Sequence, residues 1–166
     1  MRFVTLAGTK HKLVDNAPQI GDVINIKAAK AGSFEQTSIT REHKYLVLLS
    51  FPSADTSICD MQILRGAELS EKYPNFDYAS ISMDLPPALK NYQEGHKVGK
   101  IQLFSDYLDR HNAVDLGVLI ENIQLCARGM FILDENNKIV YMQLNDEIKK
   151  QVDFDEFEKK LAEFNN

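Results

Sequence analysis

The chain has 166 residues, enough for one domain with a substantial hydrophobic core, and we expect a single domain over residues 1–166. Its net charge of −5 argues against a nucleic-acid surface and against attraction to anionic membranes. No apolar run approaches the ~20 residues that span a bilayer, and the N-terminus lacks the apolar core of a signal peptide. We therefore expect a cytoplasmic protein.

The first 51 residues predict a hairpin, a loop-rich segment and a buried strand. Residues 2–6 and 11–14 flank AGTK and are expected to pair as a short hairpin. Turn signals in NAPQIGD and KAGS predict loops after it. Residues 44–51, KYLVLLSF, form a continuous apolar run that is typical of a strand buried on both faces.

A helix is predicted from Ser57 to Tyr73, where the apolar spacing becomes helical. Ser57 and Asp60 have the spacing of a capping box, a pair of side chains that closes the start of a helix. The apolar side of this helix is expected to carry Ile58, Met61, Leu64 and Leu69.

The rest of the chain continues to alternate between strands and helices. This order predicts an α/β fold, a thioredoxin-like mixed β-sheet flanked by helices on both faces and preceded by the N-terminal β-hairpin. The expected elements are strands at 77–83, 101–104, 125–133 and 139–144, with a turn at 134–138, and helices at 86–95, near 106–113 and at 153–164.

The chain contains only two cysteines, which are expected to be thiols in a reducing compartment. No cysteine–histidine cluster has the spacing of a zinc site, so we expect neither a metal nor a cofactor. The four histidines are scattered among polar neighbours and are expected at the surface.

Cys59 lies in the stretch FPSADTSICD, at a strand-to-helix turn and not inside an apolar segment. Free backbone N–H groups and the helix dipole favour negative charge in the first turn of a helix, so this position favours the thiolate. Thr56 could offer its hydroxyl to the thiolate or to a substrate oxygen, and Pro52, which has no N–H, could shape and shield the pocket. An inert buried thiol is the alternative for Cys59, and a helix N-cap is the alternative for Thr56.

The spacing proline-x-x-x-threonine-x-x-cysteine at Pro52, Thr56 and Cys59 resembles the active site of the peroxiredoxins. The fuller stretch is most similar to their thiol peroxidase branch, the Tpx-type atypical two-cysteine enzymes. SMDLP at 82–86, CARGMFILDENNKIVY at 126–141 and the N-terminal hairpin resemble further features of that branch, in the same order along the chain.

The resemblance implies a role for each matching residue. Cys59 would attack the O–O bond of a peroxide and become a sulfenic acid. Thr56 and Arg128 would orient the peroxide and stabilise the charge that develops on its distal oxygen, and Pro52 would shield the sulfur. Arg128 interrupts an otherwise apolar strand, where an unpaired charge is costly to bury, and a thiolate partner would explain it. A surface or salt-bridging arginine is the alternative.

The chain departs from this branch at the resolving cysteine, which usually lies on the helix after SMDLP. Gln93 stands at that position and cannot form a disulfide, and Pro87 replaces a residue that is usually aromatic. Cys126 is the other thiol; two residues before Arg128 on one strand, it would share that residue's face at a separation of about 6–7 Å. It is expected to be either a small core residue or an unusual resolving cysteine.

Three classes of function follow from these residues. The first is a thiol peroxidase that reduces hydrogen peroxide and alkyl hydroperoxides and is recycled by an external thiol, either a low-molecular-weight thiol or a partner protein such as thioredoxin. If Cys126 instead resolves the sulfenic acid, thioredoxin is the expected reductant. The second is a peroxide-sensing or regulatory protein with little turnover, and the third is a structural or chaperone-like protein. A dithiol oxidoreductase is disfavoured because no C-x-x-C occurs. The resemblance also implies a homodimer.

Overall fold

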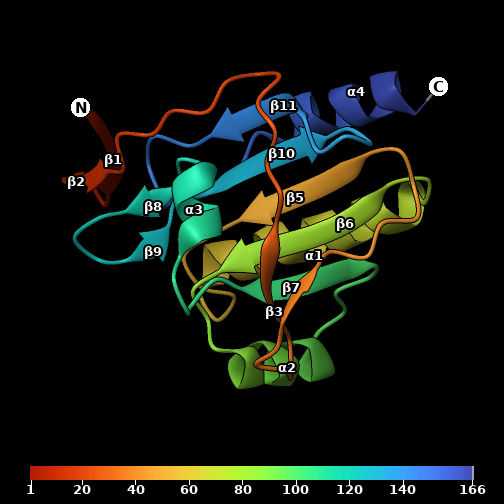
Figure 1. The fold of residues 1–166 in the computed structure, drawn as a ribbon, viewed down its shortest axis with the longest axis horizontal. Helices are drawn as coiled ribbons and strands as arrows, with labels where there is room; N and C mark the ends of the chain where they lie inside the picture. Colours follow the sequence, from red (N-terminus) through yellow and green to blue (C-terminus); the bar gives the residue numbers. More distant parts are fainter. Residues whose placement is uncertain (166) are drawn as a thin grey trace.

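A computed structural model describes residues 1–165 of the chain; Asn166, the last residue of the predicted domain, lies outside the described part. A seven-stranded sheet has the order β11-β10-β5-β6-β7-β3-β4, and a four-stranded sheet has the order β1-β2-β8-β9 (Figure 1). The elements in chain order are β1 (Arg2–Leu6), β2 (Thr9–Leu13), β3 (Lys27–Lys30), β4 (Gln36–Ser38), β5 (Leu46–Ser50), α1 (Ser57–Lys72), β6 (Asp77–Ser82), α2 (Pro86–Gly95), β7 (Ile101–Ser105), α3 (His111–Asp115), β8 (Leu119–Ile120), β9 (Leu125–Cys126), β10 (Gly129–Leu133), β11 (Ile139–Leu144) and α4 (Phe154–Phe164).

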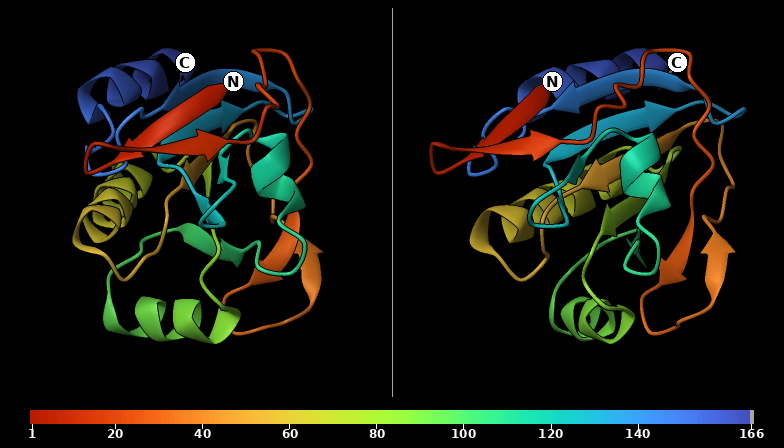
Figure 2. Two further views of the ribbon diagram at one scale, coloured as in Figure 1. Left: turned by 90° about the vertical axis from the view of Figure 1, so that its left-hand side faces the viewer. Right: turned by 60° about the vertical axis from the view of Figure 1, so that its left-hand side comes forward.

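The central strands β5, β6 and β7 run parallel, and β10 pairs antiparallel with β5. Alternate side chains of these strands enter two hydrophobic clusters, one on each face of the large sheet. Helices α1, α2 and α4 contribute to one cluster, while α3 and the small sheet contribute to the other. Figure 2 shows α1 and α3 on opposite sides of the central strands. The predicted mixed sheet with helices on both faces is confirmed. None of the helices in residues 1–165 is both long and apolar enough to cross a membrane.

The N-terminal hairpin is confirmed, but its turn is tighter than predicted. Ala7 and Gly8 alone make the turn, both with positive φ, so that β2 already begins at Thr9. The segment predicted as loops holds two short strands, β3 and β4, which extend the large sheet beyond β7. Their polar ends conceal them in the sequence, because only Ala28 and Ala29 of β3 are buried.

Helix α1 has the predicted start and span, and Leu69 is buried as expected, but the cap of the helix and the rest of its buried face differ from the prediction. Thr56 is the N-cap, so Ser57 is already inside the helix and the capping box is wrong. Met61 is 62% exposed, and Ile58 and Leu64 are only partly buried. The buried face is instead a row of mostly small or polar residues that fits closely against the sheet: Cys59, Gln62, Ile63, Gly66, Ala67, Leu69 and Ser70.

Residues 125–133, predicted as one strand, form two strands in different sheets. Strand β9 pairs with β8 in the small sheet, whereas β10 pairs with β5 and β11 in the large one. The chain crosses between the sheets at Ala127 and Arg128, where the N–H of Ala127 donates to Val118 and the carbonyl of Arg128 accepts from Asn145. The sequence conceals this break because both pieces are equally apolar.

The helices after β7 follow the predictions more closely. The short helix expected near 106–113 begins at His111, because the Asp106 carboxylate precedes it and accepts from the backbone N–H of Ala113 and from the Asn112 side chain. Helix α4 lies within the predicted range and buries Phe157 and Leu161 on one face, and Asp153 caps it by accepting from the N–H of Glu156 at 3.0 Å.

Candidate active site

Cys59 lies in the first turn of α1, as predicted, and its side chain is completely buried. The first intrahelical hydrogen bond runs from the N–H of Asp60 to the carbonyl of Thr56 at 2.8 Å. The hydroxyl of Thr56 does not cap the helix; it donates to the carbonyl of Ser53 at 3.0 Å. The N–H groups that open α1 therefore have no capping side chain and remain available to an anion.

Pro52 and Thr56 belong to the loop that connects β5 to α1, and Asp84 fixes this loop. The Asp84 carboxylate accepts from the hydroxyl of Ser53 at 2.6 Å and from the N–H of Ala54 at 2.8 Å. It also accepts from the hydroxyl of Ser82, at the end of β6, at 2.9 Å. Sequence reasoning missed Asp84, although a carboxylate directly after a buried strand was a signal that could have identified it.

Arg128 lies inside the protein on the α1 side of the large sheet, and only 2% of it is exposed. Its Nε donates to the carbonyl of Ile148 at 2.9 Å, and its Nη1 donates to Oε1 of Gln62 at 2.8 Å. Gln62 follows Cys59 by three residues on α1, so the guanidinium adjoins the helix face that carries the sulfur. Within residues 1–165 Arg128 forms no ion pair with a carboxylate, and both hydrogen-bond partners are neutral. This excludes the surface or salt-bridged alternative.

Gln62 is a second site residue that sequence reasoning missed. Its side chain is buried, and its Nε2 donates to the backbone carbonyls of Ser50 and Gly129 at 3.2 Å each. The amide nitrogen is thus fixed by β5 and β10, while the amide oxygen accepts a hydrogen bond from Arg128. A polar residue on the buried side of a helix, three positions after Cys59, was the signal in the sequence.

Cys126 does not share a face with Arg128, so that prediction is wrong. It belongs to β9 and to the hydrophobic cluster of the small sheet, whereas Cys59 belongs to the cluster on the α1 side. The expected alternation fails because the strand ends at Cys126 and the chain changes sheets before Arg128. Burial raises the pKa of the Cys126 thiol well above its usual value, and the nearby carboxylates of Asp106 and Asp84 add to the effect.

Helix α2 carries Gln93 and Pro87, both exposed. Its buried Tyr92 points back towards α1, and the phenol donates a short hydrogen bond to Oδ1 of Asp60. The ring of His96, which ends α2, stacks on Tyr92 with ring centres 4.0 Å apart. The histidines are expected from the sequence only as scattered surface groups, and the stacking of His96 on Tyr92 is not predicted. The position of this ring pair depends on how α1 and α2 pack together.

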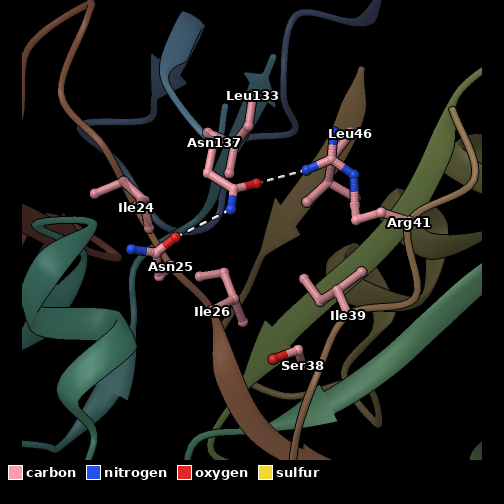
Figure 3. A pocket seen from close by; sticks show the side chains of 9 residues that line it. All are labelled: Ile24, Asn25, Ile26, Ser38, Ile39, Arg41, Leu46, Leu133 and Asn137. Carbon is pink, nitrogen blue, oxygen red and sulfur yellow. Dashed lines mark hydrogen bonds between the residues drawn. The ribbon is translucent and has the colours of Figure 1, made fainter. Parts of the chain in front are cut away.

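A small pocket of about 80 Å³ lies at the opposite end of β5, near Leu46, and contains none of the predicted site residues (Figure 3). Arg41 at its edge donates to Asn137 at 2.6 Å, and Asn137 donates to Asn25 at 3.0 Å. These polar groups satisfy one another, so we interpret this pocket as structural.

The ligand atoms of Asp106, Asp109 and His111 lie within 4.8 Å of one another and are the group in residues 1–165 whose spacing suits a metal ion. Asp106 already accepts hydrogen bonds at the start of α3, and Asp109 pairs with His111 at 2.6 Å. The arrangement is explained without a metal.

Comparison with known proteins identifies the family. The sequence model of the AhpC/TSA family matches residues 18–142. The chain belongs to the AhpC/TSA family. It is 33% identical to a thiol peroxidase of Bacillus subtilis over 84% of this chain and 80% of the relative. It is 30% identical to a thiol peroxidase of Oceanobacillus iheyensis over 92% and 89% of the two chains.

Solved structures agree with the AhpC/TSA assignment. A peroxiredoxin-like protein from Aquifex aeolicus superposes with a TM-score of 0.86 at 28% identity, covering 98% of this chain and 97% of that one. A thiol peroxidase from Chromobacterium violaceum superposes with a TM-score of 0.85 at 18% identity, over 98% and 96% of the chains, which supports the fold. The thioredoxin-like fold and the relation to thiol peroxidases, predicted from the sequence, are confirmed.

Proposed function

We propose that this chain is a thiol peroxidase that reduces hydrogen peroxide and alkyl hydroperoxides at Cys59. The thiolate sulfur attacks one peroxide oxygen, an S–O bond forms and the O–O bond breaks. The second oxygen takes up a proton from the solvent and leaves as water or an alcohol, and Cys59, which keeps the attacked O–H group, becomes a sulfenic acid. Because Cys59 is buried in the structure, the peroxide must approach through the first turn of α1.

The observation that carries this proposal is the environment of Arg128. Burying a guanidinium costs free energy unless an anion or good hydrogen bonds compensate it, and here the partners are a carbonyl and an amide. The positive charge is therefore not neutralised by the protein's own carboxylates. It is available to the Cys59 thiolate and to the oxygen that becomes negative as the O–O bond breaks.

Thr56 and Pro52 complete the proposed site. The Thr56 hydroxyl donates its proton to the carbonyl of Ser53. The lone pairs of the Thr56 oxygen are therefore free to accept a hydrogen bond from the hydroperoxide O–H. Pro52 adds no competing N–H to this loop. The free N–H groups at the start of α1 favour negative charge at the sulfur.

We further propose that an external thiol recycles the sulfenic acid. Gln93 cannot form a disulfide, and Cys126 is buried on the other side of the sheet with a raised pKa, so neither supports an intrachain resolving step. The reductant is then a low-molecular-weight thiol or a thiol protein such as thioredoxin. A homodimer in the cytoplasm, expected from the sequence, is part of the same proposal.

Mass spectrometry after one equivalent of peroxide tests this function directly. We expect a sulfenic acid on Cys59, trapped by dimedone, and no Cys59–Cys126 disulfide. Cys59→Ser should abolish peroxide consumption, whereas Cys126→Ser should retain it with small thiols. An unreactive Cys59 would refute the peroxidase, and a Cys59–Cys126 bridge would refute recycling by an external thiol. A sulfenic acid that no thiol reduces would instead favour the sensor.

A further inference from the structure

A groove lies beside Cys59, between the first turn of α1 and the helix α2. Two adjoining pockets of about 150 and 290 Å³ form it, and both are lined by Ala54, Tyr92 and His96. The smaller pocket also includes Thr56 and Asp60, which flank Cys59 in the chain. A group of a few heavy atoms fits this space, since one water molecule occupies about 30 Å³ of liquid. The groove therefore leads to the turn that carries the sulfur.

His96 is held in one orientation and one tautomer in this groove. Its Nδ1 lies 2.9 Å from the carbonyl oxygen of Tyr92, and because a carbonyl only accepts, Nδ1 carries the proton of the neutral ring. Stacking on Tyr92, with ring planes 9° apart, fixes the plane of the imidazole. The lone pair of Nε2 is left free to take a proton, and Oδ1 of Asp60 lies 3.7 Å from it, where it can hold the imidazolium that forms.

The charges around the groove favour one class of ligand. Asp55 and Asp84 line it together with Asp60, and burial, followed by the hydrogen bond to Asp60, raises the pKa of Tyr92, so the phenol stays neutral at pH 7. These carboxylates repel anions, so a neutral or cationic molecule is preferred. The titratable and charged groups that line the groove, adjoin it or flank His96 in the chain are Asp55, Cys59, Asp60, Asp84, Tyr92, Glu94 and Lys97.

We propose that this groove receives a small neutral or cationic thiol that reduces the Cys59 sulfenic acid, with His96 as its general base. The inference rests on the proposed peroxidase function. The S–H bond of the thiol breaks and its proton moves to Nε2 of His96. The thiol sulfur attacks the Cys59 sulfur, a disulfide bond forms, and the S–O bond breaks. The departing hydroxide takes the proton back from His96 and leaves as water, and a second thiol then releases Cys59 by disulfide exchange.

Separate measurement of the two half-reactions tests the role of His96. Stopped-flow mixing with peroxide alone gives the rate of sulfenic acid formation, and mixing the oxidised protein with 2-mercaptoethylamine gives the rate of its reduction. In His96→Gln we expect reduction to slow at least about 10-fold, as for loss of a general base, and formation to change far less. His11→Gln, a substitution on β2 remote from the groove, is the matched control. If wild-type Cys59 forms no sulfenic acid, the peroxidase itself fails; if His96→Gln reduces its sulfenic acid at the wild-type rate, only this inference fails.

The pH profile distinguishes a base from a residue that only caps α2. In the wild type, the rate of reduction should fall more steeply towards low pH than the thiolate fraction of the reductant does, because only a neutral imidazole accepts the proton. In His96→Gln the rate should follow only that thiolate fraction. At equal thiolate concentration, 2-mercaptoethylamine should react faster than 2-mercaptoethanol, and 2-mercaptoethanesulfonate should be slowest. Identical pH profiles in the two proteins would overturn the general base, and a reversed order of thiols would overturn the cation-preferring groove.

Discussion

Gln62 accepts a 2.8 Å hydrogen bond from Nη1 of Arg128 and lies one helical turn after Cys59. The same amide donates to the carbonyls of Ser50 and Gly129, so both neighbouring strands fix its orientation. The guanidinium of Arg128 is consequently positioned by a neutral amide, and its positive charge is preserved. A glutamate in place of Gln62 would neutralise that charge.

Gln62→Glu should therefore slow the oxidation of Cys59 by about 10- to 100-fold, the range that corresponds to one charge-assisted hydrogen bond. The new carboxylate would pair with Arg128 and place a second negative charge near the sulfur. The rate of sulfenic acid formation is the measurement. Gln102→Glu, at a half-buried glutamine on β7 that also bonds backbone carbonyls, is the control for general effects on the fold. Equal rates in wild type and Gln62→Glu would contradict this role.

Thr56→Val should lower the rate of peroxide reduction by roughly 100-fold while Thr56→Ser stays within a few-fold of the wild type. Valine keeps the shape but removes the oxygen that accepts from the hydroperoxide. Little change in stability is expected, because the hydroxyl does not cap α1 and Thr56 is exposed. Peroxide consumption and thermal unfolding should be measured on both variants. A valine variant with wild-type activity would leave Thr56 with a structural role only.

Asp84→Asn should loosen the loop that carries Pro52 and Thr56. The carboxylate accepts three hydrogen bonds, and an amide, with one oxygen, cannot accept all of them in the same geometry. A loss of about 1–3 kcal/mol in the free energy of loop closure is expected. Hydrogen exchange of the amides at 53–56 reports it directly. Ser82→Ala removes one of the three donors and should increase hydrogen exchange less. Faster hydrogen exchange at 53–56 in Ser82→Ala than in Asp84→Asn would argue against Asp84 as the residue that fixes the loop.

Asp77 should make stability depend on pH at the end of the sheet remote from Cys59. Burial alone raises the pKa of Asp77, but hydrogen bonds from the His43 side chain, from the N–H groups of His43 and Glu42, and from Arg41 outweigh it, so the pKa lies below its ordinary value. The lowered pKa means that this stabilisation is complete above the unfolded-state pKa of about 3.9 and is lost as the pH falls through the folded-state pKa.

The comparison of wild type with Asp77→Asn checks this. The difference in the free energy of unfolding should be large at pH 6 and should shrink as the pH falls below about 4. Denaturant unfolding between pH 2 and 7 gives the difference, with the exposed Glu135→Gln as the control. A difference that stays constant down to pH 2 would mean that the carboxylate charge of Asp77 does not stabilise the fold.

Local sequence patterns were sufficient where the determining interactions are themselves local. The apolar run of β5 specifies a doubly buried strand, and the spacing of Phe157 and Leu161 specifies the face of α4. The motif of Pro52, Thr56 and Cys59 lies within eight residues, so its loop and helix start could be predicted. The two halves of the 125–133 segment could not be separated, because the second half joins the large sheet by pairing with β5, which lies about 80 residues earlier in the chain.

By itself the sequence determined the order of the principal strands and helices and the family, and it singled out Cys59 as the candidate reactive cysteine, because these depend on residue type and short spacing. Only the tertiary structure decided which side chains meet that cysteine's helix. Hydrogen bonds connect Gln62 with Arg128 and Asp60 with Tyr92, and Cys126 lies across the sheet from Cys59. The physical reason is that a hydrogen bond between distant residues depends on how the helices pack on the sheet, which no short stretch of sequence specifies.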